Sequence, residues 1–140
     1  MFRTIPRSRT NPQYNSEALA EALCKSRIDY EHVAALGGLR GRKRDVRADV
    51  NTFWQNQRFP NYADYAMSEE LHLGHATQCA TMCEEAVWWR CHRQIIADYL
   101  IAAGETVFHI LERKHLVEPA SMTGAAKIGP AGTLTYSVDV

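Results

Sequence analysis

Residues 79–110 limit the fold of this chain more than any other segment, because three differently patterned stretches follow one another there. Cys79 to Cys83 has the composition of a strand, and apolar residues then recur at helical spacing from Trp89 to Ala103, ahead of Gly104. Thr106 to Ile110 is again typical of a strand. A strand, a helix and a strand in this order predict a βαβ unit with a right-handed crossover.

A second βαβ unit is predicted near the N-terminus. Phe2 to Ile5 forms its first strand, a helix begins at residue 15 or 16, and residues 28–32 alternate between apolar and charged side chains as a strand does. A further short helix is expected from Asn61 to Leu73. Together these patterns predict the α/β fold class, as a single three-layer domain with a small, mostly parallel sheet built from βαβ units.

The length of 140 residues fits one domain, and 46% hydrophobic with 23% charged residues is ordinary for a globular protein. We expect an α/β domain at residues 1–111 and a Gly- and Pro-rich C-terminal tail at residues 112–140, with an edge strand in TLTYSV. No apolar run reaches the roughly 18 residues that span a bilayer, and the N-terminus lacks the apolar centre of a signal peptide. These features predict a cytoplasmic protein without membrane contact, whose four cysteines stay reduced.

Charge is divided unevenly along the chain although the formal net charge is zero. Residues 1–60 contain eleven Lys and Arg against six Asp and Glu, and residues 61–140 contain five against ten. Such asymmetry favours a positive face that attracts an anionic ligand, either a small molecule or a nucleotide.

The segment from Met82 to Arg93 brings two thiols, two carboxylates, an imidazole and two guanidinium groups within twelve residues. It lies between a predicted strand end and a predicted helix start. Unpaired N–H groups of a helix N-terminus bind anions at this place in α/β proteins, and they lower the pKa of a nearby thiol. The segment therefore predicts an anion-binding site with a reactive cysteine.

Individual roles follow from side-chain chemistry. Cys83 is the predicted nucleophile, with Glu85 as general acid or base and His92 as a proton carrier. Trp89 is predicted to stack on a ligand. The predicted anion-binding residues are Arg7, Arg9, Arg90 and Arg93. The alternative for Cys83 is a structural thiol in the core, because cysteine is among the most commonly buried residues.

A zinc site is the third interpretation of this region. Nitrogen and sulfur ligands are offered by His75, Cys79, Cys83, Cys91 and His92. Their spacing does not give the two close pairs of a structural zinc site. We therefore expect no metal and no cofactor.

A nucleic-acid or nucleotide binding module is the rival hypothesis. The basic loop at residues 40–47 is followed by aromatic residues, a combination typical of proteins that bind single strands. These aromatic residues are Phe53, Trp54, Phe59, Tyr62 and Tyr65. The neutral overall charge weighs against this class, since dedicated nucleic-acid binding domains are usually basic.

Five separated motifs resemble one known family. In chain order they are TIPRSRTNPQYN, YEHVAALGGLRG, FWQNQRFPNYADYAMSEE, MCEEAVWWRCHRQIIADYL and FHIL. On these motifs, which lie within residues 3–111, the chain resembles the bacterial domain-of-unknown-function 488 (DUF488) family. The resemblance implies a single α/β domain without an established activity.

The sequence also differs from the pattern of that family in three respects. Members have a strand and a helix ahead of the segment that matches Arg3, and about three or four more helical turns between the parts that match Ser68 and Met82. Glu84 stands where the family has a small residue. The remaining alternative is therefore a degenerate or truncated member without activity, whose exposed apolar surface is covered by self-association.

Overall fold

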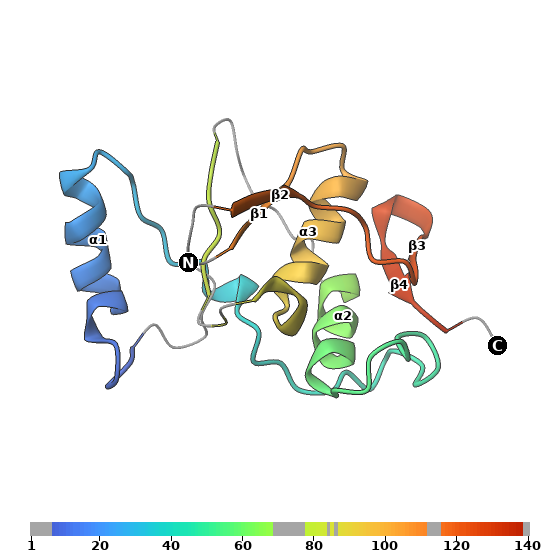
Figure 1. Cartoon of the computed structure of the whole chain (residues 1–140). Helices are drawn as coiled ribbons and strands as arrows, with labels where there is room; N and C mark the ends of the chain where they lie inside the picture. The colour runs from blue at the N-terminus through green and yellow to red at the C-terminus, as the bar shows by residue number, and fades with distance from the viewer. Residues whose placement is uncertain (1–6, 69–77, 84, 86, 112–115, 139–140) are drawn as a thin grey trace.

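The structure is a computed structural model of the whole chain, and it describes residues 7–68, 78–83, 85, 87–111 and 116–138 (Figure 1). The α-helices in this part of the chain are α1 (Ser16–Lys25), α2 (Arg58–Ser68) and α3 (Arg93–Ala102). The strands are β1 (Phe108–Leu111), β2 (Leu116–Pro119), β3 (Ala126–Ile128) and β4 (Leu134–Tyr136). Short 3-10 turns are η1 (Pro12–Tyr14), η2 (Ala34–Leu36), η3 (Trp88–Arg90) and η4 (Pro130–Gly132).

The two sheets of the described residues are both antiparallel hairpins. β1 pairs with β2, with His109 opposite Glu118, and β3 pairs with β4, with Lys127 opposite Thr135. The predicted α/β domain with a mostly parallel sheet is therefore wrong. The strand predicted at residues 106–110 does form, as β1. It pairs with β2, which follows it in the chain, and not with the strand that was expected at residues 79–83. The fold is mixed, with three helices and two small sheets in the described part.

The prediction failed because an alternation of apolar and polar side chains favours an extended backbone but does not specify which segment pairs with it. Residues 28–32 and 79–83 are without regular secondary structure, so neither is a strand. The predicted strand at residues 2–5 lies outside the described residues. β1 instead takes the nearest extended segment, since closing a short hairpin costs less chain entropy than closing a crossover.

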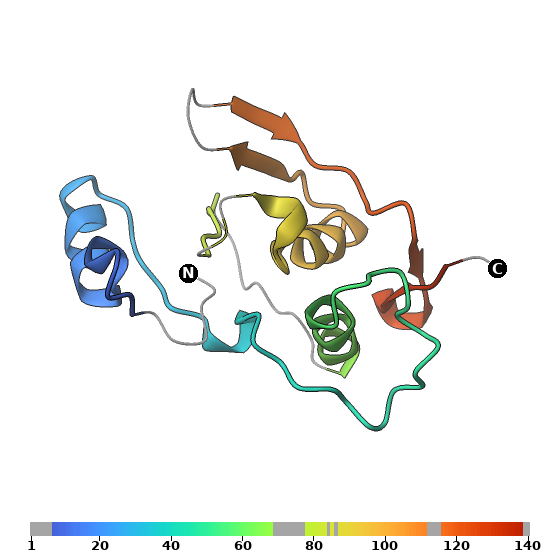
Figure 2. The same cartoon turned by 60° about the horizontal axis from the view of Figure 1, so that its bottom comes forward.

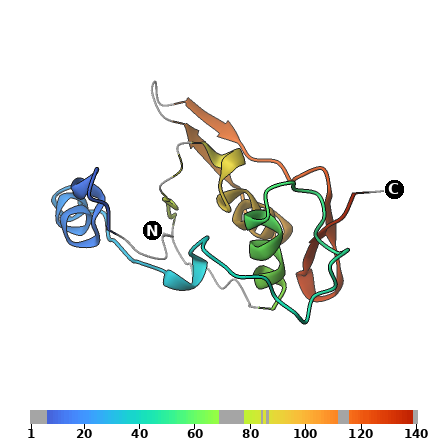
Figure 3. The same ribbon diagram turned by 90° about the horizontal axis from the view of Figure 1, so that it is seen from below.

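Helices α2 and α3 lie side by side at the centre of the molecule in all three ribbon views (Figures 1, 2 and 3). The β1–β2 hairpin flanks α3, and the β3–β4 hairpin closes the other side (Figure 2). The core between them consists of Leu36, Phe59, Tyr62, Ala63, Ala66, Ile95, Ile96, Leu134 and Tyr136. Both core residues of β4 are fully buried. The C-terminal segment that begins at residue 112 thus contributes side chains to the core.

Buried polar groups tie β4 to the helices. The Asn51 side chain donates a hydrogen bond to Asp64 of α2 (2.8 Å) and accepts one from the backbone N–H of Tyr136 (2.9 Å). Asp98 of α3 accepts a hydrogen bond from the backbone N–H of Thr123, just before β3 (2.9 Å). These bonds hold the C-terminal hairpin in a fixed register on α2 and α3.

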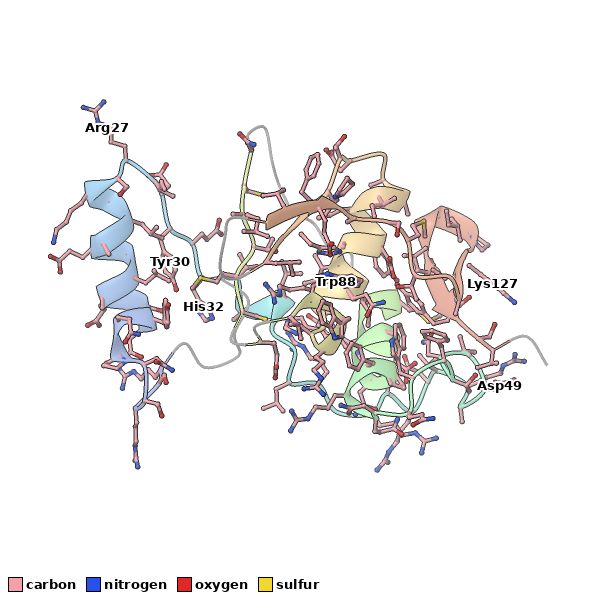
Figure 4. All side chains as sticks on the ribbon, in the orientation of Figure 1. Arg27, Tyr30, His32, Asp49, Trp88 and Lys127 are labelled. Carbon is pink, nitrogen blue, oxygen red and sulfur yellow. The ribbon has the colours of Figure 1, made fainter. Side chains whose placement is uncertain are left out.

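Helix α1 stands at one side of the molecule, away from α2 and α3 (Figures 1 and 3). The prediction of a helix that begins at residue 15 or 16 is confirmed, yet none of its residues is buried. Tyr30 extends from the following segment back toward it (Figure 4), and its hydroxyl lies 3.1 Å from the hydroxyl of Ser16. The helix is therefore held by local contacts more than by a shared core.

None of the described helices is both long and apolar enough to cross a membrane.

Candidate functional site

Cys91 lies at the junction between η3 and α3. The turn Trp88–Arg90 ends with an extended residue at Cys91 (φ −129°, ψ 146°), and α3 starts two residues later. This break in the helical backbone directs the Cys91 side chain toward the first turn of α3, where the backbone N–H of Arg93 lies 3.4 Å from its sulfur. Cys91 is buried, with 2% of its surface exposed.

Cys83 reaches the same place from residues 78–83, which have no regular secondary structure. Its Sγ atom lies 2.7 Å from Cys91 Sγ, and Cys83 is only half-buried. Both residues are free thiols in the structure. Because the two sulfurs are in contact, they lose their protons as a coupled pair and not independently.

The two thiols of the pair are not equivalent. The hydrogen bond from the Cys83 thiol lowers the pKa of Cys91 well below its usual range, and this effect outweighs the opposing effect of burial. The His92 side chain and the N–H of Arg93 lower it further. The same hydrogen bond, together with burial, raises the pKa of Cys83. Of the two thiols, Cys91 is therefore the one whose ionisation the surroundings favour, with Cys83 as its hydrogen-bond donor.

His92 is packed closely beside Cys91. Its Nδ1 atom lies 3.5 Å from Cys91 Sγ, and its ring centre lies 4.8 Å from that of Tyr62. On its other side, a Cβ atom at Gly38 would collide with the imidazole ring, so a larger residue at that position requires the ring to move. Its Nε2 atom is buried without a hydrogen-bond partner in the described part of the chain.

Arg93 links the two ends of the site. Its backbone N–H faces Cys91, and its Nη2 donates a hydrogen bond to the backbone oxygen of Glu85 (2.6 Å), two residues beyond Cys83. The positive charge also lowers the pKa of Cys83, although less than the other effects raise it. Its Nε atom is buried and has no partner among the described residues. The Nη2 end of the guanidinium lies at an exposed position, so the positive charge beside the thiol pair can attract an anionic ligand there.

Of the predicted site residues, the structure places Cys83, His92 and Arg93 around the thiol pair. Glu85 is exposed and takes part through its backbone oxygen. Four others lie on the surface: Arg7, Arg9, Arg90 and Trp89. The prediction omitted three residues that shape the site, namely Cys91 as a proton partner, Tyr62 and Gly38.

The aromatic pair ahead of Cys91 is anchored to the β1–β2 hairpin. Trp88, at the centre of Figure 4, stacks on His109 with ring centres 4.2 Å apart, and its Nε1–H donates to Glu118 (2.8 Å). Trp89 packs edge-on against Trp88 and stays 51% exposed. The hairpin therefore fixes η3, and through it the position of Cys91.

A separate cavity of about 320 Å³ lies beside the basic loop. Its wall includes Arg42 and Arg47 from the loop, together with Asn51, Trp54 and Asp64. The basic loop is not wholly free, since the Arg40 guanidinium binds the backbone oxygens of residues 34, 35 and 37 and covers the Tyr65 ring. In this cavity, Arg42 and Arg47 of the predicted basic loop share a wall with Trp54, one of the predicted aromatic residues.

No group of three or more metal-binding side chains occurs within the residues that the structure describes. His75, one of the considered zinc ligands, lies outside them.

Comparison with known proteins identifies one family. Residues 2–100 match the model of a family described as a domain of unknown function, DUF488. Neither the curated proteins nor the solved structures contain a match to the chain.

Proposed function

The chain belongs to the DUF488 family, and we propose that in this member residues 83–93 form a thiol-dependent catalytic site for a small anionic substrate. The family description assigns no activity, so the proposal rests on the geometry of the site. The observation that carries it is the 2.7 Å contact between Cys83 and Cys91 beside the first turn of α3. A pair of thiols in contact at a helix N-terminus, one of them with a lowered pKa, has the features of a reactive site and not of an inert core cysteine.

Exposure divides the roles between the two thiols. Cys83 is half-buried and Cys91 is buried, so Cys83 is the sulfur that meets a substrate. As Cys83 attacks, its proton passes over the short contact to the Cys91 thiolate, which acts as the general base. His92 and the N–H of Arg93 stabilise the negative charge on Cys91 between turnovers. Glu85, the acid or base predicted from the sequence, has no assigned step in this scheme.

Arg93 and the N-terminus of α3 supply the anion-binding component. The Arg93 guanidinium carries a positive charge close enough to lower the pKa of Cys83, and its Nη2 end lies at an exposed position where an anionic substrate group would pair with it. The N–H groups of Arg93 and Gln94 at the start of α3 point to Cys91, and the positive end of the helix dipole favours negative charge there. The substrate's charged group is thus held next to the sulfur that reacts.

The proposal is tested by measuring the alkylation rate of each cysteine against pH in the folded protein, with mass spectrometry to resolve the sites. We expect Cys83 to react with an apparent midpoint below neutral pH, because its rate follows the ionisation of Cys91, whose thiolate accepts the Cys83 proton during the attack. In Cys91→Ala the midpoint moves toward the ordinary thiol value of about 8.5. Phosphate in the buffer slows the wild-type reaction at Cys83.

The exposed residues Cys24 and Cys79 are internal controls for reagent access. Circular dichroism of Cys91→Ala verifies that the variant is folded, and Cys91→Ser provides a second variant of nearly unchanged volume. An identical pH profile for Cys83 in wild type, variants and unfolded chain rejects the proposal. The pair would then be structural, as in a degenerate family member.

We propose nucleotide binding at the cavity beside the basic loop as the second candidate function. It is supported by Arg42 and Arg47, which line a cavity of about 320 Å³ next to Trp54. Binding of a short oligonucleotide should weaken steeply with salt, and Arg42→Gln with Arg47→Gln should reduce it while Cys83→Ser does not. Equal binding by the double arginine variant rejects this candidate.

A further inference from the structure

We propose that Cys83 and Cys91 are a redox pair that small disulfides carrying a carboxylate oxidise from a dithiol to a disulfide within the chain, and that the corresponding thiols reduce again by the reverse exchange. This inference rests on the proposed function, because the same two sulfurs react, and it names the substrate class. It goes further in requiring that both sulfurs form covalent bonds in one cycle.

The geometry already favours bond formation between these two sulfurs. Their separation of 2.7 Å is within about 1 Å of a disulfide bond, which is about 2.05 Å long. Cys83 belongs to a segment without regular secondary structure, and Cys91 occupies the extended residue between η3 and α3. A small shift of the Cys83 segment therefore closes the bond without disturbing a helix or a sheet.

The exchange takes place in two balanced steps. In the first, the Cys83 sulfur attacks one sulfur of the substrate disulfide, its proton passes to Cys91 and then to the departing thiolate, and a mixed disulfide on Cys83 forms with release of one substrate thiol. In the second, the Cys91 thiolate attacks Cys83 Sγ, which forms the internal disulfide and releases the second substrate half as a thiolate. The chain loses two electrons and the substrate disulfide gains them.

Cys91 suits the second step for two physical reasons. It is buried against His92 and the first turn of α3, so small molecules in solution reach Cys83 first. The His92 side chain and the Arg93 N–H also favour its thiolate, and both contacts remain after Cys83 has lost its proton to become a mixed disulfide. A mixed disulfide at Cys83 is therefore short-lived.

The charge of the substrate follows from Arg93. Its guanidinium is fixed by the backbone oxygen of Glu85 at an exposed position, and its charge acts on Cys83. A carboxylate on the substrate would pair with this exposed positive charge while the disulfide meets Cys83. Glutathione disulfide has this character, whereas cystamine has the same disulfide group with cationic ends.

The test is oxidation of the full chain by each of these two disulfides, in a Cys24→Ala/Cys79→Ala background that leaves only the pair. We expect loss of two hydrogens and a Cys83–Cys91 cross-linked peptide, formed roughly 10-fold faster with glutathione disulfide than with cystamine. Arg93→Gln should bring the two rates close together. Arg27→Gln is the matched control, since Arg27 projects from the end of α1, away from the site (Figure 4).

Single cysteine variants separate the two steps. Cys91→Ala should accumulate the mixed disulfide at Cys83, and Cys83→Ala should react slowly because Cys91 is buried. A wild-type chain that keeps a stable mixed disulfide, or that is not oxidised at all, overturns the inference. If the oxidation rate is the same with glutathione disulfide and cystamine, and is unchanged in Arg93→Gln, the assignment of the substrate class is overturned.

Failure of this inference is distinguishable from failure of the proposed function. If Cys83 is alkylated below neutral pH but glutathione disulfide forms no internal bond, the thiol site stands and the redox cycle is rejected. If Cys83 titrates as in the unfolded chain, the proposed function itself fails, whatever the oxidation experiment shows.

Discussion

The two hairpins of this protein have the same pairing and similar strand lengths but different environments. β3–β4 directs Leu134 and Tyr136 into the core, where both are fully buried. β1–β2 leaves Phe108, Ile110 and Val117 more than half exposed on one face. The difference shows that the contribution of a hairpin to the stability of the fold depends on how many of its side chains are buried. Antiparallel backbone pairing alone does not determine it.

The hairpins also differ in how they attach to the helices. β4 is joined to α2 through the buried side chain of Asn51 and packs on Trp54, with ring centres of Trp54 and Tyr136 4.5 Å apart. β1–β2 is joined to η3 through Trp88, at a partly exposed position. We therefore expect β3–β4 to support global stability, and β1–β2 to support the local geometry of the thiol site.

Tyr136→Ala should have the largest effect on this comparison. Removing a fully buried aromatic side chain leaves a cavity against Trp54, at a cost of about 3–5 kcal/mol in the free energy of unfolding. The matched change on the other hairpin, Phe108→Ala, should cost less than about 1 kcal/mol because Phe108 is 54% exposed. Urea unfolding followed by circular dichroism measures both, and equal losses would contradict the contrast.

Asn51→Ala should have the next largest effect. It removes the partners of two buried groups, the backbone N–H of Tyr136 and the carboxylate of Asp64, and should cost about 1–3 kcal/mol. Gln57→Ala is the control, because Gln57 makes its hydrogen bond to Asn61 on the surface. A difference within error between the two variants would show that the hydrogen bonds to β4 contribute little.

The sequence predicted the helices well because helix signals are local. The helix expected from Trp89 to Ala103 is α3, and the expected stop at Gly104 is confirmed by its positive φ of 90°. The start was wrong by four residues, since the turn at Trp88–Arg90 and the extended Cys91 come first. The helix expected at residues 61–73 begins earlier, at Arg58, and its predicted end lies outside the described residues.

The sheet and part of the site were not predictable in the same way, because they depend on contacts between separate segments. The patterns at residues 28–32 and 79–83 were interpreted as strands, but both segments are without regular secondary structure, because a local pattern does not supply the partner strand that a sheet requires. Cys91 was overlooked as the partner of Cys83 because it was placed within the predicted helix. The position of Gly38 against His92 has no signal in the sequence at all.

Trp88→Phe should have a moderate effect that is confined to the weaker hairpin. Phenylalanine retains an aromatic ring against His109 but loses the hydrogen bond to Glu118, which should cost about 1 kcal/mol. Hydrogen exchange should increase in β1 and β2 more than in β4. Trp89→Phe is the matched control, with an expected change below about 0.5 kcal/mol because Trp89 is half-exposed. Uniform loss of protection in both hairpins would mean that they unfold as one unit.

The smallest expected effect is a pH dependence with opposite signs at the two hairpins. Burial lowers the pKa of His109 in β1 below its usual value of 6.5, so the folded state favours the neutral ring. Its contribution to stability is present above about pH 6.5 and is lost as the pH falls toward the lowered value, because the unfolded chain then binds the proton more readily. Asp98 accepts the hydrogen bond that holds the segment before β3, and burial raises its pKa above the usual 3.8. Its contribution to the stability of the fold is therefore present below pH 3.8 and is lost as the pH rises through the raised pKa.

Two substitutions separate these contributions from the other titrating groups. The difference in unfolding free energy between wild type and His109→Gln should shift against wild type as the pH falls below about 6.5. The difference between wild type and Asp98→Asn should shift against wild type as the pH rises above about 4, where the buried carboxyl is forced to ionise. If both differences in unfolding free energy change with pH in the same direction, the two hairpins have similar electrostatic environments. Their contrast then lies in the burial of apolar side chains alone.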